Sequence, residues 1–240
     1  AAASGAYAYS SGLCCADSAS AEVYTLAVPV ALPMSATGSG NASASGLGGA
    51  IFSGGALDLT GGGLYEFTGN RAIGGAAASG AYAYSSGHGG AIYASDNVDI
   101  QGATFTGNSA TTTNTGDLSS GLGGAIYHGS TLSTSTFKLT ALDTTNGAII
   151  FEGNTHNHGA GGATPNSIYF ANTRTSGDST TNATFDVASG ATFHMLDPLA
   201  SQADNFTPPG GTPYDNLNLI LNKTGSGTWV LAGVSDMQSA

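Results

Sequence analysis

Two short motifs alternate along this chain, and their alternation constrains its fold more than any other feature. Gly-Gly-Ala occurs six times, and three of the copies continue with Ile and an aromatic residue. These three full copies begin at Gly48, Gly89 and Gly123, which are 41 and 34 residues apart. Phe-x-Gly-Asn alternates with them in three copies, beginning at Phe67, Phe105 and Phe151. Repetition of this kind predicts a solenoid, in which successive units stack and bury one continuous core.

Each motif supplies parts of a solenoid corner and strand. Paired glycines permit sharp corners or close approach between backbones, and the pairs are Gly48-Gly49, Gly89-Gly90 and Gly123-Gly124. The residues that follow predict short strands whose alternate side chains point inward, and they include Ala50, Ile51, Ile92 and Ile126. In the second motif we expect Phe to point inward and Gly to turn the chain. Asn either adopts the left-handed backbone conformation of the turn or hydrogen-bonds to the turn with its side chain. Stacking of the repeats would place three side chains in one ladder, namely Asn70, Asn108 and Asn154.

The predicted fold is all-β, a right-handed parallel β-helix with variable loops. Because a repeat exceeds one coil of roughly 20 residues, we expect two coils per repeat. Residues 1–45 are expected to form an N-terminal cap or assembly strand, and residues 46–200 the GGAI/FxGN β-helix. Residues 201–240 are expected to continue the solenoid as a C-terminal β-strand unit. There, Leu217-x-Leu219-x-Leu221 and Trp229-x-Leu231 alternate around a glycine turn and predict strand–turn–strand.

Composition narrows the classes of function. Only 8% of the residues are charged, and the formal net charge is −11 with four Lys and Arg. So few cations exclude nucleic-acid binding and disfavour anionic membrane surfaces. No stretch of 18 apolar residues predicts a membrane helix, so we expect no membrane insertion by this chain. The opening Ala-Ala-Ala suits a product cleaved after small residues, which favours a secreted, extracellular protein of the bacterial cell surface.

Two features near the start of the sequence point to assembly. Residues 1–12 and residues 76–87 are identical, and both contain the sequence Ala-Tyr-Ala-Tyr. The duplication has two interpretations: a local event without a role, or two equivalent structures, of which the first, with Tyr7 and Tyr9, docks as an added strand beside a neighbouring subunit. Cys14 and Cys15 are adjacent, so a vicinal disulfide, a bond to another subunit and two free thiols all stay open.

Groups that could carry chemistry are scattered. Asp96 and Asp99 are close in sequence, but the residues around them predict strand and turn. His156-x-His158 has the spacing of two same-side strand residues and could bind a metal, although a loop pair without metal is the simpler interpretation. The sequence therefore predicts no enzyme, no cofactor and no metal site. The alternative is a carbohydrate-active β-helix lyase or glycoside hydrolase, which needs paired carboxylates or a calcium-bound acidic cluster.

The alternating motifs of residues 46–199 resemble the polymorphic outer-membrane protein family of chlamydiae, whose autotransporter passengers repeat GGA(I/L/V) and FxxN. Thr192–Leu199 is similar to the family's strand ending in Asp-Pro, and Lys223–Leu231 to a strand repeat of autotransporter passengers. The resemblance implies a surface-displayed β-helix for adhesion and self-association. Its partners would be further copies of itself and host or neighbouring cell-surface receptors or glycans. A subunit that polymerises head-to-tail into an extracellular filament is the competing variant of this structural role.

Overall fold

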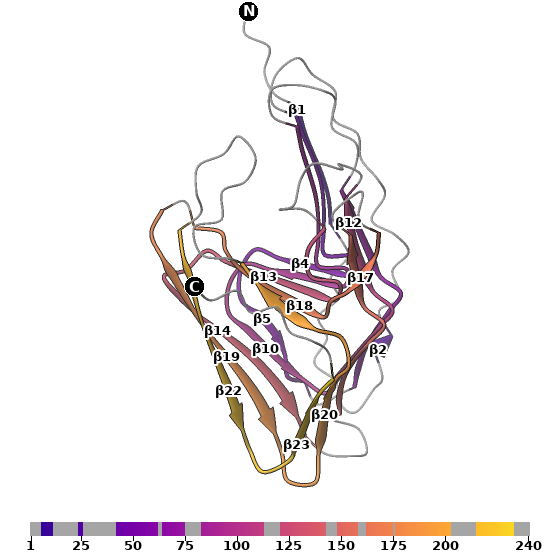
Figure 1. The fold of residues 1–240 in the computed structure, drawn as a ribbon, viewed down its shortest axis with the longest axis vertical. Coiled ribbons are helices and arrows are strands. Elements are labelled where there is room, and N and C mark those ends of the chain that lie inside the picture. The colour runs from indigo at the N-terminus through magenta and orange to yellow at the C-terminus, as the bar shows by residue number, and fades with distance from the viewer. Residues whose placement is uncertain are drawn as a thin grey trace, which may run out of the picture.

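The computed structural model describes residues 6–11, 24–25, 42–61, 64–74, 83–112, 121–142, 148–157, 162–174, 176–202 and 215–232. Within these ranges the protein is all-β, has no helix, and places mostly parallel strands in stacked sheets (Figure 1). This arrangement agrees with the predicted class of a β-solenoid.

Five sheets make up the described structure, and we name them here. The GGAI sheet contains β4 (Ile51–Ser53), β9 (Ile92–Ala94), β13 (Ile126–Ser130), β18 (Ile168–Asn172) and β21 (Leu199–Ser201). The long-strand sheet contains β5 (Leu57–Leu59), β10 (Val98–Gln101), β14 (Thr134–Ala141), β19 (Ser179–Val187) and β22 (Leu217–Thr224). The FxGN sheet contains β2 (Tyr24–Thr25), β6 (Tyr65–Thr68), β11 (Ala103–Thr106), β15 (Ile149–Glu152), β20 (Thr192–Met195) and β23 (Thr228–Leu231).

Two smaller sheets complete the set. The flank sheet contains β7 (Arg71–Gly74), β12 (Ser109–Thr112), β16 (Thr155–Asn157) and β17 (Thr164–Pro165). The N-terminal sheet contains β1 (Ala6–Ser11), β3 (Ala42–Leu47) and β8 (Ala83–His88), and it projects from the top of the molecule (Figure 1). Every strand pair among the described residues is parallel except β16 with β17.

The chain passes in turn through the GGAI, long-strand and FxGN sheets, and we call each such pass a rung. Ile51 pairs with Ile92, and Ile92 pairs with Ile126, so successive GGAI copies lie on adjacent rungs. Phe67 likewise pairs with Phe105 on the next rung. The expectation of two coils per repeat is therefore wrong. One repeat is one rung, because each rung holds several strands and loops of uneven length.

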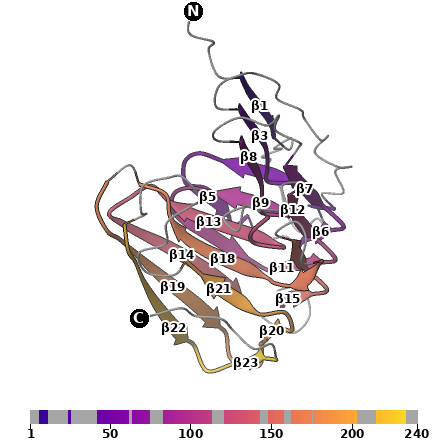
Figure 2. The same ribbon diagram turned by 45° about the horizontal axis from the view of Figure 1, so that its top comes forward.

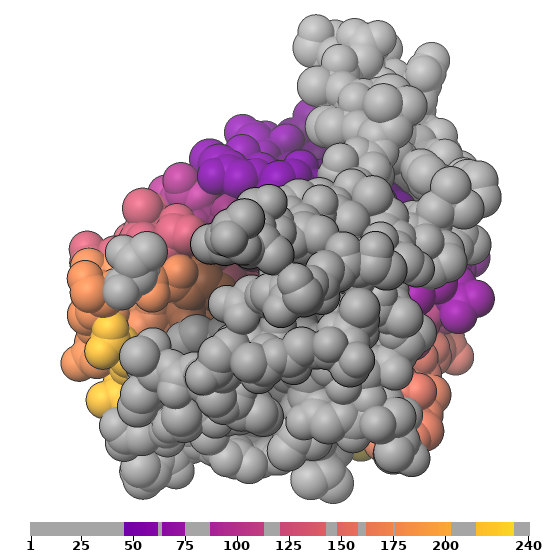
Figure 3. Space-filling model, turned by 90° about the horizontal axis from the view of Figure 1, so that it is seen from above, coloured from indigo at the N-terminus to yellow at the C-terminus, as the bar shows by residue number. Residues whose placement is uncertain are grey.

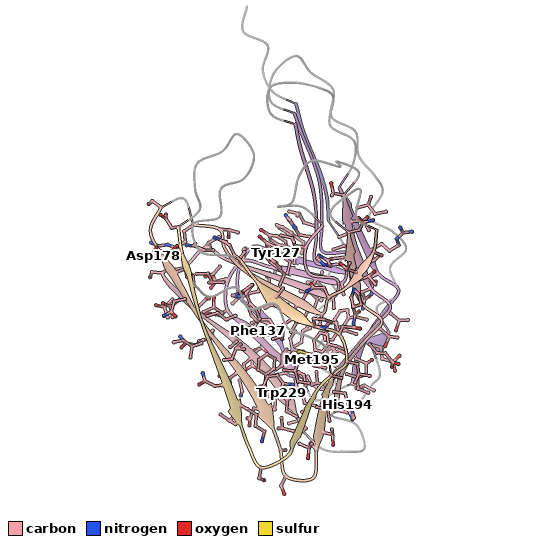
Figure 4. The ribbon with its side chains drawn as sticks, in the orientation of Figure 1. Tyr127, Phe137, Asp178, His194, Met195 and Trp229 are labelled. Carbon is pink, nitrogen blue, oxygen red and sulfur yellow. The ribbon has the colours of Figure 1, made fainter. Side chains whose placement is uncertain are left out.

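The core lies between the three main sheets. On β19 the buried and half-buried residues alternate along the whole strand, which is the period of a sheet with one face inward. Phe67, Phe105 and Phe151 are fully buried, with ring centroids 4.8 and 4.6 Å apart in successive pairs. Figure 4 shows Phe137, Met195 and Trp229 directed into the space between the sheets. Parallel pairing thus piles like residues into columns that run from rung to rung.

The two copies of the duplicated segment lie in one sheet of one chain. In the N-terminal sheet β3 separates β1 from β8, and all three strands are parallel (Figure 2). Ala6 pairs with Ala42, which pairs with Ala83, whereas the sequence equivalent of Ala6 is Ala81. The copies are therefore equivalent strands shifted by two residues.

Much of the predicted N-terminal cap lies outside the described residues. Cys14 and Cys15 lie outside them, and for Tyr7 and Tyr9 only the backbone of β1 is described. Tyr24 and Thr25 form β2, which pairs with β6 ahead of the first rung of the FxGN sheet. The first 45 residues thus contribute strands to two sheets at this end of the molecule.

Candidate binding surface and the columns behind it

The glycine pairs act through close backbone contact between rungs. Gly89 has φ 66°, a left-handed conformation that favours glycine. A Cβ on Gly90 would lie 1.9 Å from the carbonyl oxygen of Gly124 on the next rung. The first glycine therefore turns the corner, and the second leaves room for the neighbouring backbone.

A third glycine column was missed from the sequence. A Cβ on Gly87 would lie 1.9 Å from the carbonyl oxygen of Thr111, where the N-terminal sheet approaches the flank sheet. The same contact recurs in the adjacent rungs at Gly46 and Gly121. The full motif is Gly-x-Gly-Gly-Ala-Ile, and the Ser-Gly that precedes each of the three copies was its signal.

The predicted asparagine ladder is confirmed. Asn108 is fully buried, and its side-chain oxygen accepts from both the backbone N and Nδ2 of Asn70, at 2.9 and 3.0 Å. Its own Nδ2 donates to the Phe67 carbonyl at 2.9 Å and to Asn154 Oδ1 at 2.9 Å. Asn108 therefore hydrogen-bonds to the rungs on both sides, and buried polar groups need such partners.

The ladder ends at an aspartate that the sequence motif did not include. Asp197 is buried and accepts from the backbone N of Gly153 and from both the backbone N and Nδ2 of Asn154, at 2.8 to 3.0 Å. A carboxylate has only acceptors, so it closes the ladder without needing a further amide. Asp197 lies in the Asp-Pro segment noted for the family resemblance.

The GGAI column also changes in the last rungs. Ile126 pairs with Ile168, and Ile168 pairs with Leu199, so Asn166-Ser167 and Asp197-Pro198 stand where the third rung has Gly124-Ala125. The Gly-Gly-Ala copy that begins at Gly161 does not take part in the column. Its Gly162 and Ala163 are exposed beside the antiparallel β17.

One histidine lies inside the core. His128 pairs with Ala94 and Phe170 on the adjacent rungs, and its ring makes edge contacts with Phe137 and Phe170. Its Nε2 lies 2.9 Å from the carbonyl oxygen of Asp96, so Nε2–H is the donor and Nδ1 is unprotonated. Burial lowers the pKa of His128 to about 4, against the smaller raising effects of the Asp96 backbone and charge. The ring is therefore neutral at pH 7.

Outward aromatic residues form a stack on the GGAI sheet. Phe52, Tyr93, Tyr127 and Tyr169 lie on successive rungs, with ring centroids 5.2 to 5.8 Å apart and interplanar angles of 8 to 14°. Sugar-binding aromatic residues present a flat face to the ligand, but here each inner ring covers its neighbour's face. The stack therefore reinforces the rungs, as cross-strand aromatic pairs do.

The outer face of the long-strand sheet carries an array of hydroxyls and amides. Buried residues alternate with outward ones on β14 and β19, and the outward residues fall into columns across β14, β19 and β22. These residues are Thr134, Thr136, Thr180, Asn182, Thr184, Asn218, Asn222 and Thr224. Parallel strands set such groups roughly 4.8 Å apart across the sheet and roughly 6.6 Å apart along it. Figure 3 shows the rungs stacked from indigo to yellow along one side of the molecule.

Three charged residues also lie side by side on this face. Asp58 pairs with Asp99, and Asp99 pairs with Lys138, on β5, β10 and β14. Sequence analysis missed this column because its members come from three different repeats. Aligning the first two copies on Ile51 and Ile92 would have shown both carboxylates at the same offset.

The sequence candidates for chemistry do not converge. Asp96 uses its backbone carbonyl for His128, whereas Asp99 faces outward beside Lys138. His156 is half-buried on β16 opposite Ala110, and His158 lies outside the described residues. In the described part of the chain, no group of three or more His, Cys, Asp and Glu is placed to hold a metal ion.

Comparisons with protein-family models, curated proteins and solved structures found no match to this chain. No helix among the described residues is long and apolar enough to cross a membrane.

Proposed function

We propose that this chain is a right-handed parallel β-helix of the autotransporter-passenger type, displayed outside a bacterial cell. It acts through its exterior in cell attachment and self-association, and it carries no catalytic centre. The stacked parallel sheets support the helix, and the GGAI and FxGN columns support the resemblance to polymorphic outer-membrane proteins. An experimental structure in which the chain coils about the axis of the β-helix in a left-handed sense would contradict the proposed handedness.

The outer face of the long-strand sheet, with its outward hydroxyls and amides, is the feature that supports the proposed attachment. The buried polar side chains of the ladder are used between rungs, whereas the Thr and Asn of β14, β19 and β22 point outward. Within this array the hydroxyls of Thr136 and Thr224 donate to Asn97 and Asp186. Hydroxyls and amides are both donors and acceptors, so they match the hydroxyls of a glycan or a glycosylated receptor. Repetition on successive rungs supplies many weak equivalent contacts, whose avidity exceeds that of any one contact.

A face-specific variant tests this proposal. We expect that Thr180→Ala, Asn182→Ala and Thr184→Ala together reduce attachment of the purified chain to glycan arrays and to cells by at least about tenfold. All three side chains are half-buried on β19 and point outward. Alanine removes their hydrogen-bonding groups at a folding cost of a few tenths of a kcal/mol each.

The matched control changes outward threonines of the FxGN sheet. Thr104→Ala, Thr106→Ala and Thr192→Ala remove similar groups from β11 and β20. We expect this variant to attach as well as the original chain, with an unchanged circular dichroism spectrum in both cases. Equal attachment by the two variants would contradict the assignment of the long-strand face.

A further inference from the structure

Three tyrosines meet ring to ring on the outer side of the GGAI sheet. Tyr93, Tyr127 and Tyr169 pair in register on β9, β13 and β18. The ring centroids of Tyr93 and Tyr127 lie 5.2 Å apart, and those of Tyr127 and Tyr169 lie 5.8 Å apart. The interplanar angles of the two pairs are 10° and 8°. Because the backbone bonds of the sheet fix neighbouring strands at roughly 4.8 Å, the fold itself holds these phenol rings face to face.

The central ring of the three is more shielded than the outer two. Tyr127 is 6% exposed, whereas Tyr93 and Tyr169 are half-buried. Both neighbours pack against a small apolar cluster around Tyr127 that is separate from the main core. The His88 ring also stacks on Tyr127, with centroids 4.4 Å apart. A reactive species formed on Tyr127 therefore lies against groups of its own chain, and little of it faces solvent or another molecule.

The first ring of the stack differs in its chemistry. The centroid of Phe52 lies 5.2 Å from that of Tyr93, but phenylalanine carries no hydroxyl. A phenol that loses one electron and its hydroxyl proton becomes a phenoxyl radical, whose unpaired electron is shared between the oxygen and the ortho and para carbons. A phenyl ring has no such route. Radical chemistry in this stack therefore belongs to the three tyrosines, and Tyr127 is common to both of their pairs.

The central ring has one ortho carbon above a glycine. A Cβ on Gly129 would lie 2.7 Å from Cε1 of Tyr127, which is ortho to the hydroxyl. The absence of a side chain at Gly129 thus leaves the space that the ring occupies over its own strand. The ortho carbons are the positions at which two phenoxyl radicals couple, so this space matters for the reaction as well as for the stacking.

We propose that Tyr127 is a site of oxidative cross-linking, where a carbon–carbon bond to Tyr93 joins the second and third rungs. Each phenol loses one electron and one proton, and an ortho carbon of one radical bonds to an ortho carbon of the other. The two ortho hydrogens then move to the oxygens as the rings regain aromaticity. The product is dityrosine, which has two hydrogens fewer than the two tyrosines.

The oxidant comes from outside the chain and is hydrogen peroxide acting through a haem peroxidase. Peroxide takes up the two electrons and two protons and becomes two water molecules. Tyr93 is favoured over Tyr169 as the partner of Tyr127 because its ring centroid is nearer. This modification goes beyond the proposed function and depends on neither attachment nor self-association.

The test is treatment of the purified full chain, at low concentration, with hydrogen peroxide and a haem peroxidase. We expect the mass of the chain to fall by two hydrogens and dityrosine fluorescence to appear, without covalent dimers. Mass spectrometry of a peptic digest should recover the peptides of Tyr93 and Tyr127 joined to each other. The bond closes a segment of 34 residues (127 − 93), so the urea midpoint of the oxidised chain should rise, as it does for a cross-link of that span.

Tyrosine-to-phenylalanine variants keep each ring and remove one hydroxyl. Tyr127→Phe should abolish the cross-link, because both pairs need this residue. Tyr93→Phe should move the bond to Tyr127 and Tyr169, whereas Tyr169→Phe should leave the bond between Tyr93 and Tyr127 in place. Tyr65→Phe is the matched control, since Tyr65 is half-buried on β6 in the FxGN sheet, and it should leave the yield of the bond unchanged. Circular dichroism checks that each variant folds.

Three results would overturn the inference. An unchanged yield of the internal cross-link in Tyr127→Phe would place the bond elsewhere. Covalent dimers at low concentration, without an internal bond, would mean that tyrosines of different chains couple before the stacked rings do. Oxidation confined to oxygen added at methionine and Trp229 would mean that the stacked phenols do not couple. The attachment assay measures none of these results, so the proposed function is tested separately.

Discussion

The first and last rungs have the same alternation of inward and outward residues but differ in how they meet solvent. Ile51 and Leu57 are buried at the first rung, whereas Leu221 and Leu231 are 36% and 46% exposed at the last. The alternation specifies which face each residue occupies, but an additional layer must cover the inward face. The contrast shows that the alternation alone does not indicate whether the inward face of a rung is covered.

The corner before each strand of the GGAI sheet also differs between the early and the late rungs. The first three rungs use Gly-Gly-Ala-Ile, but the fourth uses Asn166-Ser167-Ile168 and the fifth uses Asp197-Pro198-Leu199. Asn166 carries a side chain where the earlier rungs have glycine, and its Oδ1 accepts from the backbone N of Gly124 at 3.3 Å. The strict motif is therefore confined to the first three rungs, and the last two corners carry residues with side chains at the position of the second glycine.

The largest expected effect comes from filling a glycine corner. Gly90→Ala places a Cβ against the Gly124 carbonyl, and the rungs cannot separate without breaking the bond from Gly90 N to Gly123 O. We expect a loss on the order of 4 kcal/mol in the free energy of unfolding, measured by urea titration.

Two control variants sharpen this comparison. Asn166→Ala, at the equivalent position in the fourth rung, should cost about 1 kcal/mol for one lost hydrogen bond. Gly55→Ala, where a Cβ meets nothing within 4 Å, should be close to neutral. Equal costs for Gly90→Ala and Asn166→Ala would refute the difference between early and late corners.

The second prediction compares the middle of the asparagine ladder with its end. Asn108→Ala leaves the Phe67 carbonyl and the Asn70 donors without their buried partner, so we expect a loss of about 3 kcal/mol. Asp197→Asn keeps one acceptor oxygen and should cost about 1 kcal/mol. Thermal unfolding followed by circular dichroism measures both. A larger loss at Asp197 would show that the ladder is held from its end.

Truncation of one side chain at each end tests the comparison directly. Ile51→Ala should cost about 3 kcal/mol, because it removes buried methyl groups and leaves a cavity. Leu231→Ala should cost below about 1 kcal/mol, because nearly half of the side chain is already in water. Similar losses at both positions would mean that the two ends are equally covered.

Much of the core could be predicted from the sequence because its signals are local. Gly-Gly-Ala-Ile and Phe-x-Gly-Asn identified the corner glycines, the stacked phenylalanines and the ladder amides. The number of residues per rung was not predictable in the same way. Loops of uneven length separate the strands of a rung, and only the pairing of Ile51 with Ile92 shows that one repeat makes one rung.

The exterior was harder to predict because it is assembled from different repeats. Asp58, Asp99 and Lys138 become neighbours only through the rung register. The threonine and asparagine columns of β14, β19 and β22 depend on that register as well. His128 was one of several scattered histidines in the sequence, and its burial follows from its place opposite Ala94 and Phe170.

The smallest predicted effect is the loss of unfolding free energy at low pH that arises from His128 on the third rung. The folded-state pKa of about 4 lies below the ordinary value of 6.5, so the unfolded chain binds more protons between these pH values. Stability therefore falls as the pH drops from 6.5 towards 4, and this histidine contributes no further change below that range. We expect a contribution of about 2 kcal/mol to the loss between pH 8 and pH 5.

A pair of histidine variants isolates this contribution from that of the carboxylates. His128→Leu should remove about 2 kcal/mol from the pH dependence of the unfolding free energy, measured by urea titration at both pH values. His194→Leu is the control, because His194 lies on β20 and points outward between the buried Phe193 and Met195 (Figure 4). If the two variants had the same pH dependence as the original chain, His128 would have to be accessible to protons in the folded state. Because burial is what lowers the pKa of His128, such a result would mean that water reaches the ring in the folded protein.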